Sequence, residues 1–131
     1  QSWKSWSGVA FERVCLKHVA QIKKELGILG VSTEVSAWRY LPSNGKGAQI
    51  DLLLDRKDFV INVCEMKYSE SEFTIDKACA TALENKKQVL KSQTKTKKSI
   101  FLTFVTTFGI TNNEYAKRLI QNSITIDSLF Q

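Results

Sequence analysis

Long hydrophobic runs are absent from this chain of 131 residues, which excludes a membrane-spanning helix. No apolar stretch approaches the roughly 20 residues that such a helix needs. The opening residues, QSWKSWSG, have neither the basic nor the apolar region of a secretory signal. An initiator Met is also absent, since the single Met is Met66. We therefore expect a domain with no membrane partner, excerpted from a longer polypeptide.

Cysteine and histidine are scarce, and their placement excludes several kinds of site. Cys15, Cys64 and Cys79 form no CxxC pair and have no histidines at zinc-site spacing, so no zinc site is expected. Their odd number and apolar surroundings favour reduced, buried thiols and a cytoplasmic setting. The single histidine, His18, is predicted to be a core or boundary residue and cannot complete a Ser-His-Asp triad. Residues 45–47, Gly-Lys-Gly, lack the spacing of a phosphate-binding P-loop.

What the chain does have is ordinary globular composition with an excess of positive charge. Its length suits one domain, over residues 1–131, with a hydrophobic core of its own. The net charge of +6 favours an anionic partner without establishing one. Residues 86–98 contain six lysines and no acid. A solvated helix end and a phosphate-facing patch explain that run equally well.

Hydrophobic periodicity predicts an α/β fold with an αβββαβ core, in which helices flank a mixed central sheet. The first three strands are expected to be antiparallel, and a right-handed crossover then leads to a parallel strand. In the second helix, Cys79, Ala82, Leu83, Val89 and Leu90 are expected to face inwards. The predicted elements are a helix at 7–26 capped by Ser7 and ended by Gly27, strands at 32–41, 48–54 and 59–68, a helix at 74–92 capped by Thr74, a strand at 99–107, a helix at 113–121, and a strand at 123–126.

The predicted hairpin, QIDLLLDRKDFVINVCEMK, places charged residues inside the most apolar stretch of the chain. Glu65 and Lys67 share one face of their strand, about 7 Å apart. A turn centred near Lys57 would set Asp51 opposite Val63 and diagonal to Glu65. A shift of one residue in the register would move Asp51 to the other face. The geometry of a shared site is therefore permitted by the sequence.

A divalent cation explains why two carboxylates would lie together there. Burying either carboxylate alone is costly, and a hard cation such as Mg²⁺ or Mn²⁺ removes that cost. Lys67 would then stabilise developing phosphate charge. The plainer alternative is an ion pair between Glu65 and Lys67, with Asp51 in a separate environment. A purely structural role for the acids also stays open.

The paired motifs resemble a known family. The stretches FE, GAQIDLLLDR, INVCEMKYS and FTIDK are similar to those of the PD-(D/E)xK nuclease superfamily, which has the restriction-endonuclease-like fold. More closely, the chain resembles the C-terminal nuclease-like domain attached to archaeal-type and bacterial P-loop ATPases, which implies that it is the C-terminal part of a longer polypeptide. The resemblance covers nearly the whole chain. Ile50 stands where the motif has its proline.

This resemblance implies metal-dependent hydrolysis of DNA phosphodiester bonds, with Mg²⁺ or Mn²⁺ as cofactor. Asp51 and Glu65 would bind the metal directly, helped by the main-chain carbonyl of Met66. Lys67 would position the attacking water and stabilise the transition state. Glu12 matches the acid that members of the superfamily carry on the first helix, where it holds the metal directly or through water. A helix-dipole role explains Glu12 equally well.

The resemblance also implies partners. Lys86 and Lys87 match positions on the second helix that face the DNA backbone, and an N-terminal ATPase domain of the same polypeptide is the expected neighbour. Because the superfamily contains inactive members, a non-catalytic domain that binds DNA or a partner remains the alternative. The oligomeric state, a dimer included, stays open. Trp3, Trp6 and Trp38 are expected either to stack on bases or to pack on the domain.

Overall fold

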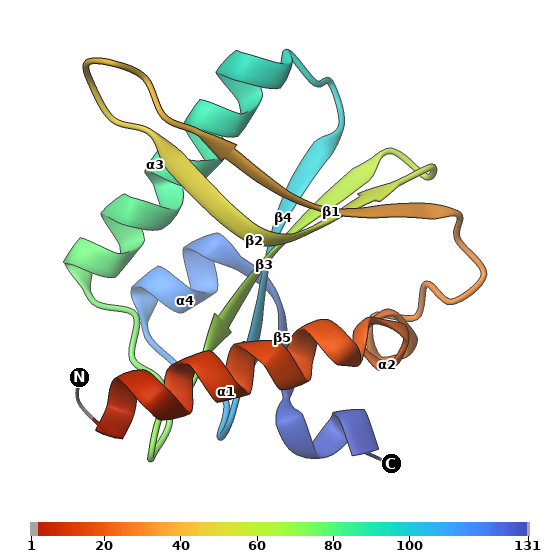
Figure 1. The fold of residues 1–131 in the computed structure, drawn as a ribbon, viewed down its shortest axis with the longest axis vertical. Coiled ribbons are helices and arrows are strands. Elements are labelled where there is room, and N and C mark those ends of the chain that lie inside the picture. Colours follow the sequence, from red (N-terminus) through yellow and green to blue (C-terminus); the bar gives the residue numbers. More distant parts are fainter. Residues whose placement is uncertain (1–2, 131) are drawn as a thin grey trace.

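The computed structural model describes residues 3–130, with side chains from residue 7 onward. Ten elements follow one another along the chain (Figure 1). They confirm the predicted α/β class and the order of its helices and strands. The elements are α1 (Trp3–Lys17), α2 (Val19–Glu25), β1 (Thr33–Tyr40), β2 (Ala48–Arg56), β3 (Val60–Lys67), α3 (Lys77–Thr94), β4 (Ser99–Thr106), α4 (Glu114–Leu119), β5 (Ile120–Thr125) and the 3₁₀ helix η1 (Ile126–Phe130).

The five strands form one mixed sheet in the order β1-β2-β3-β4-β5. Strands β1, β2 and β3 pair antiparallel, whereas β3, β4 and β5 pair parallel. The parallel step from β3 to β4 passes through α3, as the sequence predicts. Strand β4 lies between two parallel neighbours, and its last five residues are all buried, which explains why it is apolar on both faces.

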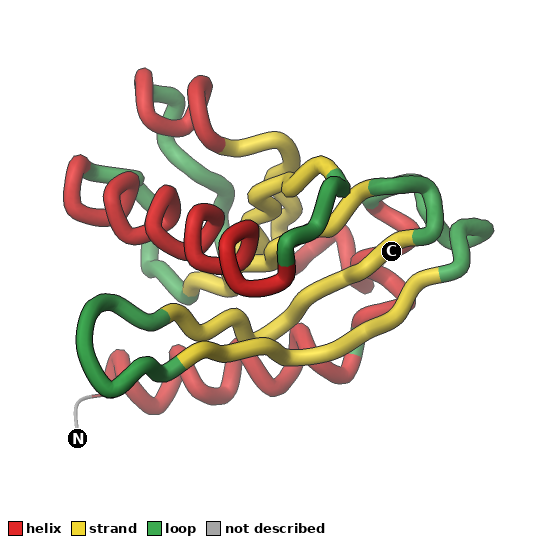
Figure 2. The backbone as a smooth tube through the Cα atoms, turned by 90° about the horizontal axis from the view of Figure 1, so that it is seen from above, coloured by secondary structure: helices red, strands yellow, loops and turns green. Residues whose placement is uncertain are grey.

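Helices cover both faces of the sheet, so the core has two halves (Figure 2). One half lies beneath α3 and α4 and contains Leu53, Val63 and Leu90. The other lies beneath α1, α2 and η1 and includes Leu52 and Cys64. Neighbouring residues of a strand enter opposite halves because side chains alternate across a sheet. Within residues 3–130, no helix combines the length and the apolar character that a membrane span requires.

The first predicted helix is broken into two at His18. Its ring Nδ1 donates to the carbonyl of Val14 at 2.7 Å, while its main-chain N–H turns to Cys15. The ring thus occupies the carbonyl that the helical N–H would otherwise use, and α2 starts afresh. The predicted N-cap was wrong, since Ser7 lies inside α1. Gly27 has a φ of 73° and follows the end of α2, as expected.

The N-cap of α3 lies two residues after Thr74, the predicted cap. Asp76 is the N-cap and accepts from the main-chain N–H of Cys79 at 2.8 Å. Thr74 instead shares a hydrogen bond with Thr111, beside a bridge between Phe73 and residue 110 that keeps this segment extended. The predicted inward face of α3 was wrong at one residue, because Ala82 is exposed and Ala80 is buried in its place. The other predicted residues do face inwards: Leu83 and Leu90 are buried, and Cys79 and Val89 are partly buried.

The hairpin of β2 and β3 forms with a register two positions from the predicted one. Leu53, rather than Asp51, lies opposite Val63, because the turn is centred on Asp58. A shift of two keeps every side chain on its predicted face. The pairing of β2 with β3 ends at Leu52 and Cys64, the residues that adjoin Asp51 and Glu65 in sequence.

A β-bulge interrupts the pairing of β1 with β2. Ser36 pairs with Leu53 and Trp38 pairs with Ile50, so two steps along β1 match three along β2. The extra residue lets Ile50 and Leu53 both enter the core half beneath α3. Asp51 lies inside this irregular segment. Trp38 packs against the same core half, which fits the packing role rather than the stacking role.

Candidate functional site

The candidate site is centred on the carboxylate of Glu65, which is only 6% exposed. Two lysines compensate its charge. Lys86 Nζ of α3 lies 2.8 Å from Oε2, and Lys67 Nζ of β3 lies 3.9 Å from Oε1. The Lys67 ammonium also lies 6.0 Å from the ring centroid of Phe73. The buried acid is therefore paired, as burial of a charge requires.

Asp51 is held beside this pair by its own strand. It is half-buried, and its Oδ1 accepts from Nε2 of Gln49 at 2.9 Å. Gln49 and Asp51 are two residues apart, so their side chains leave β2 on one side. Sequence reasoning missed Gln49, although this spacing on a predicted strand was the available signal. The amide fixes one carboxylate oxygen of Asp51, and within the described residues the other oxygen accepts no hydrogen bond.

Glu12 of α1 belongs to the same electrostatic environment. Partial burial raises the pKa of its carboxyl above the ordinary 4.5, and the negative charge of Asp51 raises this pKa further. Lys67 lowers the pKa, Glu65 raises it, and Lys86 lowers it. Residues from α1, β2, β3 and α3 thus act on one another, although they are far apart in the sequence. The fold thus brings Glu12, Asp51, Glu65 and Lys67 into one electrostatic environment.

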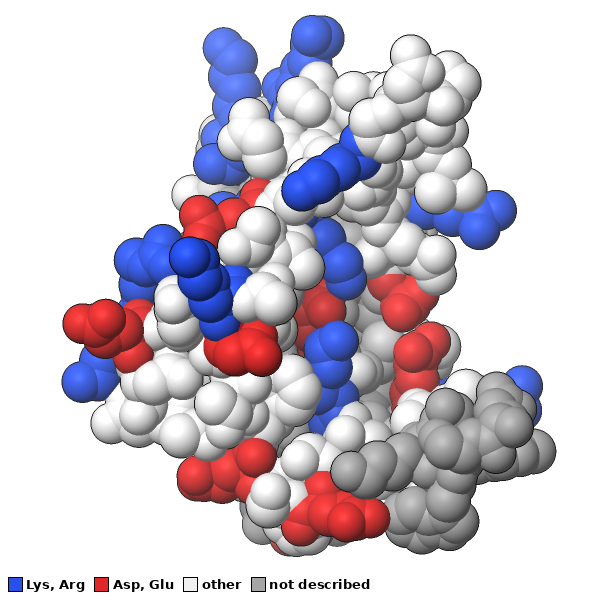
Figure 3. Space-filling model, turned by 90° about the vertical axis from the view of Figure 1, so that its left-hand side faces the viewer, with Lys and Arg blue, Asp and Glu red and all other residues white. Residues whose placement is uncertain are grey.

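The surface around these residues is hollowed and charged. Figure 3 views the molecule from the side where the N-terminal ends of α1 and α3 lie in Figure 1, and acidic and basic side chains adjoin in a hollow between two lobes. A cavity of about 380 Å³ opens beside Asp51 and is lined by Ala37, Trp38, Arg39, Gln49, Ile50 and Asp51. The candidate site is therefore accessible to a ligand.

The donor set suits a hard cation in chemistry, but the side chains are not gathered around one. Asp51, Glu65 and Glu12 offer carboxylate oxygens, the ligands that Mg²⁺ and Mn²⁺ prefer. Among the described residues, however, no three acid, histidine or cysteine side chains are arranged to hold a metal ion. Met66 packs against the core half beneath α1. Lys86 takes up one oxygen of Glu65, so this lysine would have to move for a cation to enter.

The lysine run at 86–98 divides into several environments. Lys86 binds Glu65, and Lys98 binds Asp55 at 2.5 Å and the main-chain oxygen of Arg56 at 2.9 Å. Lys87 is half-buried and makes no ion pair within the described part of the chain. The run is thus neither a uniform phosphate-facing patch nor a wholly solvated helix end. The Lys86–Glu65 pair joins residues 21 positions apart, and no local pattern in the sequence announces it.

The remaining sequence expectations concern histidine, tryptophan and cysteine. His18 is partly buried, and its ring contacts that of Phe130, with the ring centroids 4.8 Å apart. Trp3 and Trp6 belong to α1, but their side chains lie outside the described residues. All three cysteines are free, and Cys15 and Cys64 are buried. Burial raises the pKa of Cys15 to about 11 and that of Cys64 to about 12, so both thiols stay protonated.

Comparison with known proteins identifies a fold and no family. No family model matches the chain, and no curated protein matches it. A crystal structure described as "Protein of Unknown Function AF1548" is similar, with a TM-score of 0.57 and 14% sequence identity. The match covers 86% of this chain and 61% of that one, so the chain spans about three-fifths of its structural neighbour. The likeness supports the α/β architecture alone.

Proposed function

We propose that the chain is a DNA endonuclease domain of the PD-(D/E)xK type, which hydrolyses phosphodiester bonds with Mg²⁺ or Mn²⁺. One observation carries the proposal: Glu12, Asp51, Glu65 and Lys67 come from three elements and share one electrostatic environment. These are the residues that the resemblance assigns to catalysis. An ATPase neighbour and a cytoplasmic location belong to the same proposal, which takes the neighbour from the resemblance and the location from the reduced thiols.

Two carboxylates and an ammonium have distinct tasks in this reaction. Asp51 and Glu65 would hold the cation, with Glu12 and the main-chain carbonyl of Met66 completing the oxygen ligands. Once bound, the cation would supply Lewis-acid activation of the phosphoryl group and generate the nucleophile. Lys67, already 3.9 Å from Glu65, would orient the attacking water and stabilise charge on the phosphate oxygens.

Lys86 links the arrangement described above to the proposed reaction. Its ammonium neutralises Glu65 in the absence of a cation, which keeps a buried carboxylate from lying unpaired. A cation at Glu65 would repel this ammonium and free it for the negatively charged substrate. The phosphate-binding task that the resemblance gives to Lys86 is therefore compatible with its ion pair.

A non-catalytic domain of the same fold is the second candidate, and the same ion pair favours it. If Lys86 holds Glu65 permanently, no cation enters, and the charged hollow serves only to bind DNA or a partner. The absence of a ready-made metal site among the described residues is what this alternative expects. The two candidates differ in one measurable property, which is the affinity for a divalent cation.

The deciding experiment is calorimetric titration with Mn²⁺, followed by a plasmid-nicking assay with Mg²⁺. The parent should bind Mn²⁺ and nick DNA, and Asp51→Ala should bind the cation at least about tenfold more weakly. Lys67→Ala should retain the fold and the DNA affinity but lose nicking by about a hundredfold or more. Lys57→Ala, in the exposed turn after β2, is the control of equal charge.

Each outcome separates the candidates. A parent that binds no Mn²⁺ and leaves plasmid intact, yet binds DNA, establishes the non-catalytic alternative. Nicking by Lys67→Ala at the parental rate would remove this lysine from the mechanism. Equal cation affinities of parent and Asp51→Ala would place the metal elsewhere.

A further inference from the structure

The β1–β2 hairpin carries two cationic side chains that have no partner among the described residues. Arg39 on β1 and Lys46 in the loop that follows are exposed, and within the described residues neither makes an ion pair or a hydrogen bond. By contrast, Arg56, Lys86 and Lys98 are all engaged by carboxylates of the domain. Free cations on one arm of the fold are available to an external anion.

Each of the two cations lines a cavity of about 380 Å³. The cavity of Arg39 also contains Asp51 and Gln49, so it opens directly onto the candidate site. The cavity of Lys46 lies between the hairpin loop and α3 and is bounded on the helix by residues 78–85. Lys86, the next residue on that helix, binds Glu65. The first hollow therefore contains a carboxylate of the candidate site, and the second is bounded by the helix that carries the lysine partner of Glu65.

The main chain of the hairpin loop is held in place, so the attachment points of the two cations are defined. The Asn85 side chain of α3 donates to the main-chain oxygen of Gly47 at 3.1 Å. A side chain at residue 47 would collide with the main-chain oxygen of Tyr40 and crowd the ring of Pro42, so glycine is required. Arg39 and Gln49 are directly paired across the two strands. A preorganised arm loses little freedom when it binds.

An anion that contacts both cations must extend from one hollow to the other. A nucleic-acid backbone meets that requirement, because it repeats a phosphate along its whole length. Exposed Arg and Lys are suited to such contacts, and Arg can hold a phosphate with two donors. The small side chains of Ala78 and Ala82 keep the second hollow open for the strand.

We propose that the β1–β2 hairpin is the arm on which the DNA backbone is seated, with Arg39 and Lys46 binding phosphates beside the phosphate to be cleaved. The inference rests on the proposed nuclease function for its choice of substrate and adds two contacts that the resemblance does not supply. Gln49 acts as a positioning residue for Asp51. Neither Arg39 nor Lys46 touches the reacting atoms.

The test measures binding of the 131-residue chain to a fluorescein-labelled DNA duplex by anisotropy, in EDTA and over a range of salt concentrations. Arg39→Ala and Lys46→Ala should each weaken binding about three- to tenfold and reduce the slope of log K against log salt by about one. The double variant should reduce the slope by about two. Lys57→Ala removes an equal charge from the far end of the hairpin and should change the slope least.

Further variants keep the result interpretable. Arg39→Gln keeps a polar, unbranched side chain without the charge and should behave like Arg39→Ala. Arg39→Lys should recover most of the affinity. Thermal unfolding at the parental temperature verifies the fold of each variant, as expected for exposed residues without partners.

The possible failures of the two proposals are distinct. If the parent binds DNA and the hairpin variants match Lys57→Ala, the hairpin is not the seat of the backbone, and the nuclease proposal stands. If the parent binds no duplex at low salt, both proposals fail. If the slope of log K against log salt is reduced in the Arg39 and Lys46 variants and unchanged in Lys57→Ala, the β1–β2 hairpin is the arm that binds the DNA backbone.

Discussion

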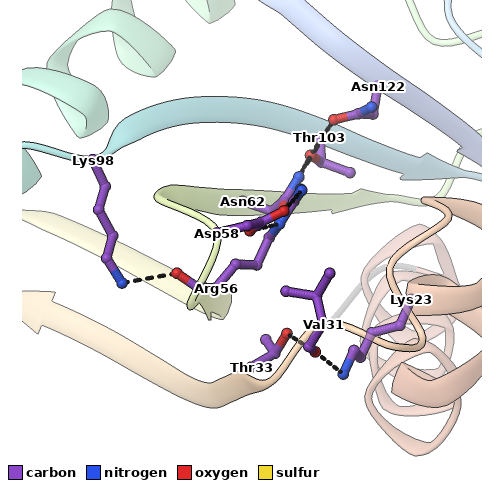
Figure 4. A network of polar contacts seen from close by, with 9 residues as sticks. All are labelled: Lys23, Val31, Thr33, Arg56, Asp58, Asn62, Lys98, Thr103 and Asn122. Atoms are coloured by element: carbon purple, nitrogen blue, oxygen red, sulfur yellow. Dashed lines mark hydrogen bonds and ion pairs between the residues drawn. The ribbon is translucent and has the colours of Figure 1, made fainter.

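Two buried polar side chains of β3, Asn62 and Glu65, lie three positions apart and have opposite kinds of partner. Asn62 is completely buried and is surrounded by neutral groups and one guanidinium (Figure 4). Glu65 is nearly as buried, and its charge is balanced by two lysine ammonium groups. Their side chains lie on opposite faces of the strand, since alternate residues of a strand share a face.

The environment of Asn62 is built from short side chains on neighbouring strands. Its amide donates to Thr103 Oγ1 at 2.9 Å and to Asn122 Oδ1 at 3.3 Å, and its oxygen accepts from Arg56 at 3.0 Å. Arg56 also forms two hydrogen bonds with Asp58 in the turn. Strands β2 to β5 are thereby joined at one level. Each of these side chains is held by a hydrogen bond to its neighbour, so the network is rigid.

The environment of Glu65 is built from long side chains that reach water. The side chains of Lys67 and Lys86 are 39% and 26% exposed, so each ammonium stays hydrated when it leaves the carboxylate. A network of mainly short, neutral side chains around a completely buried amide fixes the fold, whereas a cluster of long charged groups can exchange partners. The difference separates a structural polar site from one that is able to bind a ligand.

The largest effect should come from opening the neutral network. Asn62→Ala leaves the Arg56 guanidinium and the Thr103 hydroxyl without their partner and creates a small cavity. We expect a loss of about 3 kcal/mol in the free energy of unfolding. Urea denaturation followed by circular dichroism measures it, with Asn44→Ala in the exposed loop as the control.

Glu65→Gln is the matched change in the charged cluster. The amide oxygen still accepts from Lys86, and both ammonium groups reach solvent, so stability should change by no more than about 1 kcal/mol. A loss as large as that of Asn62→Ala would mean that the two environments serve the same structural purpose.

Thiol reactivity compares the two sides of the sheet directly. Cys64 lies on the same face of β3 as Asn62, and burial followed by the Glu65 charge raises its pKa to about 12. Cys79 is half-buried near the charged cluster; burial raises its pKa, and Lys67 lowers it. In native protein, iodoacetamide should label Cys64 at least about a hundredfold more slowly than a free cysteine. Cys79 should be labelled first.

Peptide mapping by mass spectrometry distinguishes the thiols, and denatured protein supplies the control. Equal rates for Cys64 and Cys79 in the native state would show that the network face opens as readily as the charged face.

The smallest effect concerns Glu12 and depends on pH. Because the folded protein raises the pKa of this carboxyl above 4.5, mainly by burial, ionised Glu12 disfavours the folded state. This cost appears as pH rises through 4.5 and is complete above the folded pKa. Glu12→Gln should therefore raise the melting temperature at pH 7 in EDTA by roughly 1–2 °C. The gain should vanish below pH 4.5, where the carboxyl is protonated in both states.

Calorimetry from acid to neutral pH gives the profile, and Glu70→Gln at an exposed position is the control. A gain that grows towards low pH would contradict the direction of the shift.

The sequence predicted those parts of the fold that depend on local pattern. Alternation located β1, the polar turn between two apolar runs located β2 and β3, and the apolar run at 99–107 identified the central strand. The position of Gly27 identified the end of α2. The broken helix was not predictable, because it follows from one ring hydrogen bond at His18. The cap of α3 was missed because pairing near Phe73 holds Thr74 extended, a contact with a segment far along the chain.

For the candidate site, residue types were predictable and distances were not. The motif named Asp51, Glu65 and Lys67, and the fold gives them a shared electrostatic environment with Glu12. The register was wrong by two positions because the turn is centred at Asp58 rather than Lys57. The partner of Glu65 depends on how α3 crosses the sheet, which no spacing within β3 encodes. Long-range packing, rather than local propensity, decides those contacts.

The bulge in β2 also bears on how this kind of domain could change over generations. An extra residue sits between Ile50 and Leu53, so the strand tolerates a three-for-two mismatch with β1. Loss of a single codon here would restore regular pairing and leave the sheet, its core and its helices in place. The same loss would rotate the carboxylate at position 51 away from Glu65. One small deletion would thus change the charged cluster and spare the architecture, so the two can vary independently.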